Sequence, residues 1–93
     1  MKLVLSKSAD KFLKKIPPKD AERVKSKIFH LLDIAPKMDS TSIKFGDLDT
    51  KSLKGDLQGF SRMRVGKIRV VFTVDLEQDE LIIHDIDFRG DIY

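Results

Sequence analysis

The sequence predicts an α+β domain in which a two-helix hairpin covers one face of a β-sheet. Three observations predict it: a short alternating segment opens the chain, two segments with helical apolar spacing follow, and the last third alternates apolar and polar residues. The 93 residues are enough for one hydrophobic core, so we expect a single domain over 1–93. The expected order is an N-terminal strand, two helices and a three-stranded antiparallel meander.

The first half of the chain supplies the opening strand and both helices. Residues 2–7 alternate weakly and predict the strand, and Ser8 is the expected N-cap of the first helix. Pro18 suits the first turn of a second helix that ends before Pro36. The apolar stripes are Ala9, Phe12, Leu13 and Ile16 in the first helix, and Ala21, Val24, Ile28, Leu31 and Leu32 in the second.

After a polar stretch over 36–59, read mostly as loop with short ordered pieces, residues 62–72 predict a β-hairpin. Gly66 at the first loop position favours a two-residue type II′ turn, which pairs Arg64 with Arg69. Alternation then places Met63, Val65, Ile68, Val70 and Phe72 on one face, and Arg62, Arg64 and Arg69 on the other. Because like charges directly opposite each other are destabilising, this face suggests a site for an anionic ligand.

A second hairpin runs from 72–74 through 75–80 into a last strand over 81–88. If that strand pairs with the arginine hairpin, Arg89 and Tyr93 at the end of the chain reach the guanidinium groups. Tyr93 could then stack on a base or donate a hydrogen bond, and Arg89 could face a leaving oxygen. The alternative is a frayed C-terminal tail.

Composition and charge narrow the function classes. The net charge of +3 favours an acidic partner or nucleic acid, and nine basic residues lie within residues 2–27. Cysteine is absent, which excludes thiol chemistry, and no signal peptide or membrane-spanning run is evident, so we expect a cytoplasmic protein.

The hairpin arginines can clamp phosphates through bidentate, charge-assisted hydrogen bonds, or can be solvated strand residues paired with local carboxylates. Lys51 and Lys54 precede the hairpin and are placed to touch a nucleic-acid backbone, while the helix lysines form a solvated face that attracts RNA at long range.

Other polar residues give weaker signals. His84 is a candidate general acid by residue type, but its place between apolar strand residues favours a satisfied structural histidine, and His30 merits less. Asp85 and Asp87 share a strand face, yet no histidine or third carboxylate follows at suitable spacing, so we expect neither a metal site nor a cofactor.

In the order and spacing of these segments, the chain resembles the RelE/ParE superfamily of toxins from toxin–antitoxin modules. The resemblance covers nearly the whole chain: the strand and helical hairpin, Leu53-Lys54-Gly55, the hairpin over 62–72 and the ending Arg89-Gly90-Asp91-Ile92-Tyr93. It implies a microbial-ribonuclease-like fold and, for the RelE branch, metal-independent cleavage of messenger RNA in the ribosomal A site by 2′-hydroxyl attack.

The resemblance also implies roles for single residues. Arg62 falls where RelE-type enzymes place a catalytic lysine, Arg69 at a phosphate-stabilising arginine, Arg89 at the proposed general acid and Tyr93 at the terminal tyrosine. The expected RNA contacts are Lys51, Lys54, Arg64 and Lys67.

Two positions depart from the RelE pattern. Phe60 replaces a second lysine, and Phe88 replaces a histidine that many relatives have. Arginine stays protonated in proteins and is a poor base. Catalysis would therefore depend on electrostatic stabilisation and positioning, with Tyr93 or the ribosome aiding proton transfer.

Three functions remain open at this point. The first is a ribosome-dependent endoribonuclease toxin, monomeric when free and forming a hetero-oligomer with its antitoxin. The second is a ParE-like DNA gyrase inhibitor without catalytic activity, since fold does not fix function. The third is a decayed module that only binds nucleic acid or an antitoxin.

Overall fold

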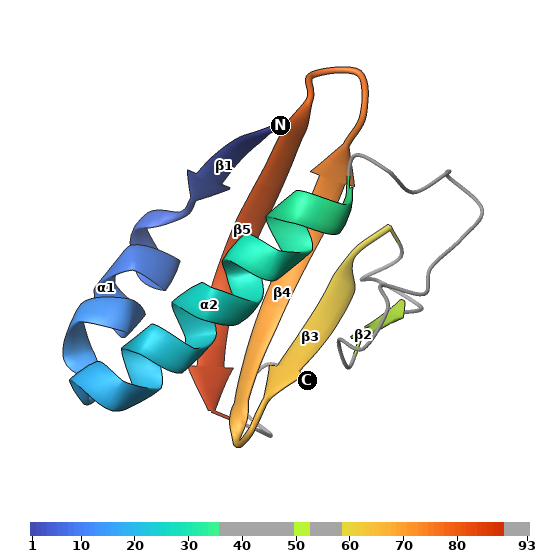
Figure 1. Cartoon of the computed structure of the whole chain (residues 1–93). Coiled ribbons are helices and arrows are strands. Elements are labelled where there is room, and N and C mark those ends of the chain that lie inside the picture. Colours follow the sequence, from blue (N-terminus) through green and yellow to red (C-terminus); the bar gives the residue numbers. More distant parts are fainter. Residues whose placement is uncertain (36–49, 53–58, 89–93) are drawn as a thin grey trace.

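The computed structural model describes residues 1–35, 50–52 and 59–88. The elements are β1 (Lys2–Leu5), α1 (Lys7–Lys15), α2 (Pro18–Ile34), β2 (Thr50–Ser52), β3 (Ser61–Val65), β4 (Ile68–Asp75) and β5 (Glu80–Phe88). Figure 1 shows both helices on one face of a single sheet with the strand order β1-β5-β4-β3-β2. The predicted α+β class is confirmed, and no helix of the described part is long and apolar enough to cross a membrane.

The sheet is mixed and wider than the meander alone. Strand β1 pairs in parallel with β5, because the two helices carry the chain across the sheet before the meander begins. Strand β2 pairs antiparallel with β3 and forms the other edge, within the stretch that the sequence predicted to be mostly loop.

The first helix begins earlier than predicted. Its N-cap is Ser6 rather than Ser8: the Ser6 hydroxyl oxygen accepts a hydrogen bond from the Ala9 N–H at 3.1 Å. Ser6 also donates its hydroxyl hydrogen to the His84 carbonyl at 2.8 Å, so the cap ties α1 to β5. The second helix has Pro18 in its first turn and ends before Pro36, as predicted.

The arginine hairpin has the predicted register. Val65 pairs with Ile68, Arg64 with Arg69 and Arg62 with Val71. Gly66 has a φ of +62° while Lys67 is not among the residues with positive φ, which fits the predicted type II′ turn.

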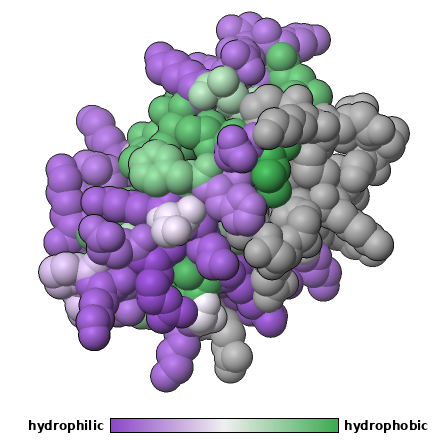
Figure 2. All heavy atoms as spheres, in the orientation of Figure 1, coloured by the Kyte–Doolittle hydropathy of each residue, from purple (hydrophilic) through white to green (hydrophobic). Residues whose placement is uncertain are grey.

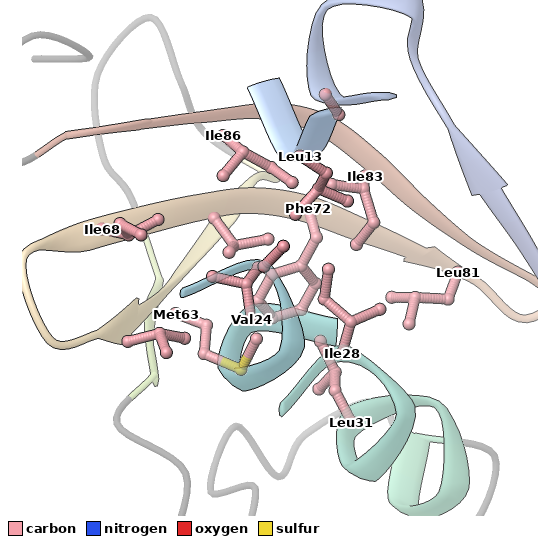
Figure 3. Packing of buried hydrophobic residues seen from close by; sticks show 14 of the residues in the cluster. Leu13, Val24, Ile28, Leu31, Met63, Ile68, Phe72, Leu81, Ile83 and Ile86 are labelled. Carbon is pink, nitrogen blue, oxygen red and sulfur yellow. The ribbon is translucent and has the colours of Figure 1, made fainter. Parts of the chain in front are cut away.

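The core lies between the helices and the strand residues that alternation assigns to them. Figure 3 shows Val24 and Ile28 of α2 close to Phe72 of β4, with Met63, Leu81 and Ile83 around them. Met63 and Val70 are fully buried, so the face of β3 and β4 that carries them is the helix-covered face. Arg62, Arg64 and Arg69 therefore lie on the opposite face.

Strand β5 contains a register shift beside β4. Val71 pairs with Asp85, but Phe72 pairs with Ile83, which leaves His84 as an extra residue between the two pairs. Such a bulge turns successive side chains toward the same face of the sheet.

Candidate functional site

Basic side chains occupy two adjacent rows on the face of the sheet away from the helices. In one row Lys51 of β2 lies opposite Arg62, which lies opposite Val71. In the other, Arg64 lies opposite Arg69. We call Lys51, Arg62, Arg64 and Arg69 the basic sheet face. Directly opposed residues have Cβ atoms about 4.5–5.5 Å apart, so the strand pairing itself concentrates this charge.

Exposure differs across the basic sheet face. Arg62 is buried, with 7% of its surface exposed, Arg69 is half-buried, and Arg64 and Lys51 are exposed. Within the described residues, the Nε of Arg69 is buried without a hydrogen-bond acceptor, although other interactions engage that side chain. Arg64 and Lys51 are thus the accessible cations of this face, and Arg62 and Arg69 are more deeply held.

Two carboxylates border this face on β5. The register places Asp87 opposite Arg69 and Asp85 opposite Val71, so the two share a face as predicted. An Asp85 carboxylate oxygen accepts the Ile86 N–H at 3.0 Å, and an Asp87 carboxylate oxygen accepts the Phe88 N–H at 2.8 Å. These bonds satisfy two backbone N–H groups in the part of β5 that β1 does not pair, since β1 ends opposite Ile83.

One ring nitrogen of His84 has a hydrogen-bond partner within the sheet. Its Nε2 lies 2.8 Å from the Thr73 hydroxyl oxygen, and its ring lies 4.7 Å from the Phe60 ring, centroid to centroid. Burial lowers the pKa of His84 from its ordinary value of 6.5, since a less hydrated site disfavours the imidazolium ion. His30 lies on α2, away from this face.

A further basic residue, Arg23 of α2, reaches the hairpin turn. Its guanidinium Nη2 lies 3.1 Å from the place that a Cβ on Gly66 would occupy, and its Nη1 lies 4.0 Å from a carboxylate oxygen of Asp20. The helical pattern of the sequence does not indicate this position for Arg23, because it does not show which turn α2 crosses. Together with Lys67 it adds positive charge at the tip of the hairpin.

The helix lysines are separate from this cluster. Figure 2, which looks onto the helices, shows hydrophilic side chains over α1 and the first part of α2. The exposed lysines there are Lys7, Lys11, Lys14, Lys15, Lys19, Lys25 and Lys27. They fit the predicted solvated face.

Three predicted site residues, Lys54, Arg89 and Tyr93, lie outside the described residues and stay predictions. Of the two aromatic departures, Phe60 contacts His84, and Phe88 is half-exposed with its ring edge-on to Phe12 at 5.3 Å. Among the residues that the structure describes, no three histidine or carboxylate side chains are grouped as a metal would require.

The sequence of this chain matches a known toxin family. The sequence model of the family described as the ParE toxin of type II toxin–antitoxin systems matches residues 3–93. The chain therefore belongs to that family, within the RelE/ParE superfamily. It is therefore a type II toxin. A comparison with curated protein sequences gives no match.

Solved structures of such toxins share the fold. The RelBE2 toxin–antitoxin complex from Mycobacterium tuberculosis has 22% identity and a TM-score of 0.72, over 95% of this chain and 96% of that chain. The YoeB/ParE toxin from Agrobacterium tumefaciens has 22% identity and a TM-score of 0.74, over 96% and 99%. The RelB–RelE complex from Methanococcus jannaschii has 27% identity and a TM-score of 0.66, over 97% and 94%.

Proposed function

We propose that this toxin is a metal-independent endoribonuclease that cleaves messenger RNA on the ribosome. The observation that carries the proposal is the basic sheet face, where strand pairing holds Arg64 directly opposite Arg69 with Arg62 and Lys51 in the next row. That arrangement costs folding stability, and an anionic ligand offsets the cost.

The reaction that this face suits is attack of a ribose 2′-hydroxyl on the adjacent phosphorus. A bond forms between O2′ and phosphorus, the bond from phosphorus to O5′ breaks, and the products are a cyclic phosphate and a free 5′-hydroxyl. Negative charge grows on the phosphate oxygens in the transition state, and preorganised guanidinium groups stabilise it.

Exposure suggests a division of roles. Arg69, half-buried and held between Arg64 and Asp87, is the proposed stabiliser of the phosphate. Arg64, Lys51, Lys54 and Lys67 bind the RNA backbone in this proposal. Because Arg62 is buried, we assign it to shaping the site around the scissile phosphate. Arg89 and Tyr93 are proposed to complete the site at the leaving oxygen and the base.

The test is cleavage of messenger RNA on programmed ribosomes. The wild type should cut, and Arg69→Ala should cut about 10²–10³-fold more slowly, the usual effect of removing one oxyanion-stabilising donor. Lys11→Ala, an exposed α1 residue away from the basic sheet face, is the matched control and should cut at nearly the wild-type rate. Equal rates for wild type and Arg69→Ala would reject the assigned role.

A DNA gyrase inhibitor is the second candidate, because the family model that matches is that of the ParE toxin. It predicts gyrase-dependent DNA breaks while messenger RNA stays intact. Purified gyrase with supercoiled plasmid, run beside the ribosome assay, separates the two functions.

We also propose an antitoxin protein as the partner. The solved complexes named above contain toxins of this fold with their antitoxins. An acidic or extended antitoxin segment over the basic sheet face would neutralise the like charges and exclude RNA. Co-expression with an adjacent antitoxin gene should protect cells, and Arg64→Glu should weaken the complex if this face is covered.

A further inference from the structure

We propose that His84 is the general base of this toxin, accepting the proton of the attacking 2′-hydroxyl. The inference rests on the proposed ribonuclease function and supplies a group that the basic side chains do not. Arginine stays protonated near neutral pH, so Arg62, Arg64 and Arg69 can stabilise charge but cannot remove a proton.

The bulge in β5 puts the imidazole on the basic sheet face. Val71 pairs with Asp85 and Phe72 with Ile83, so His84 is the extra residue and shares a face with Asp85 instead of alternating with it. Its hydrogen bond to the Thr73 hydroxyl and its contact with Phe60 place the ring on the side away from the helices. Bulges commonly re-aim side chains next to active sites.

His84 is also close to the arginines on the scale of an RNA backbone. Arg62 of β3 pairs with Val71 of β4, and Val71 pairs with Asp85 of β5, the residue after His84. Strands β3 and β5 are two strand spacings apart, about 10 Å, a gap that a long arginine side chain and one nucleotide together can span. Phe60, two residues before Arg62, already bridges that gap by touching the imidazole.

Thr73 orients the imidazole through a hydrogen bond, as the third residue of a catalytic triad orients the general base. It occupies Nε2 at 2.8 Å and leaves Nδ1 without a hydrogen-bond partner among the described residues. Because a hydroxyl can donate or accept, Thr73 can accommodate either imidazole tautomer. Nδ1 is thus the nitrogen available for proton transfer.

Partial burial keeps the imidazole mostly neutral near pH 7. Burial lowers its pKa. Among the described residues of this face, Asp85 follows His84 on β5, and the register places Arg62 two strands away on β3 with Lys51 beyond it on β2. Strand β4 contributes Thr73, and β1 contributes Val4 opposite Ile82. At the start of α1, Ser6 donates to the His84 carbonyl and Ser8 donates to the Asp85 carboxylate. A neutral imidazole is the form that accepts a proton.

The proton balance is simple. Nδ1 takes the 2′-hydroxyl proton as the bond between O2′ and phosphorus forms, the bond to O5′ breaks, and O5′ takes a proton from water. The imidazolium then returns its proton to solvent, and His84 is ready for another turnover.

The experiment is the pH dependence of single-turnover cleavage with ribosomes well below saturation, so that the profile reports the ionisations of the free toxin. For the wild type, the rate should rise with pH and level off, with a midpoint below 6.5. His84→Gln should cut about 10²–10⁴-fold more slowly and lose this rise, the usual effect of removing a general base. His30→Gln, the matched histidine control, should keep both the rate and the profile.

A second measurement uses the unaltered protein. The NMR titration midpoint of the His84 ring should equal the midpoint of the cleavage profile, and a 2′-deoxy RNA should shift the His84 signals. Two results would overturn the inference but leave the proposed function standing. In the first, the wild type cuts RNA and His84→Gln keeps the same rate and pH profile. In the second, the titration midpoint of the His84 ring differs from the midpoint of the cleavage profile. A wild type that does not cut RNA would overturn the proposed function, and the inference with it.

Discussion

The two basic regions of this molecule carry the same sign of charge but hold it in different ways. The helix lysines are exposed, and the pair that Lys14 forms with Asp10 at 2.9 Å is a solvated contact within one helix. On the basic sheet face, strand register sets which arginine opposes which, and exposure falls from Arg64 to Arg62. Charge that the backbone holds in place can recognise a phosphate geometry, whereas mobile surface charge mainly attracts.

The largest expected effect comes from removing the support under the basic sheet face. Phe72 is 1% exposed and contacts the helices from the strand that carries Arg69. Phe72→Ala should lower the free energy of unfolding by about 3–5 kcal/mol, through lost burial and the cavity left behind. Urea unfolding measures it, and Lys11→Ala should stay within about 0.5 kcal/mol of wild type. Similar values for both variants would contradict the packing described.

A smaller loss is expected at the turn that sets the arginine register. Gly66 has a φ of +62°, and an added Cβ would lie 3.1 Å from the Arg23 guanidinium. Gly66→Ala should destabilise the fold by about 1–3 kcal/mol, mostly through backbone strain, since the exposed Arg23 tip can move. Lys67→Ala, at the next turn position, should change stability far less. Thermal unfolding of both variants tests this, and a Gly66→Ala protein as stable as wild type would exclude the turn.

The smallest effect has the opposite sign. Arg64→Gln removes one of two directly opposed guanidinium groups and should raise the unfolding free energy by about 0.2–1 kcal/mol at low salt. The gain should shrink in high salt, because Arg64 is exposed and its repulsion is screened. Lys25→Gln on α2 should show no such salt-dependent gain. Lower stability of Arg64→Gln in low salt would show that Arg64 does not repel Arg69.

Local chemistry made much of this structure predictable. The turn glycine and the period-two alternation determined the arginine hairpin pairing, and the two prolines with the apolar stripes placed α2. Ser8 was a wrong N-cap because Ser6 also meets the local requirement, and its additional bond to the His84 carbonyl is long-range. The pairing of β1 with β5 and the reach of Arg23 to Gly66 depend on tertiary packing, which no local pattern contains.

The candidate site was predictable to a similar degree. Alternation placed Arg62, Arg64 and Arg69 on one face, but not the burial of Arg62. His84 reads from sequence as an ordinary mid-strand residue, and the bulge that turns it toward the arginines appears only once Val71 and Phe72 are matched with their partners on β5. Departures from alternation are thus where the residues that share this face were hardest to predict.

One measurement tests the central claim most directly: ribosome-dependent cleavage by two double variants with the same change in net charge. Arg64→Gln with Arg69→Gln removes two of the four positive charges of the basic sheet face, and Lys11→Gln with Lys25→Gln removes the charges of two exposed helix lysines. The account predicts that the first variant loses at least about 10²-fold in cleavage rate, while the second stays within a few-fold of wild type at moderate salt. Equal losses would show that total charge, and not its placement on the sheet, governs activity.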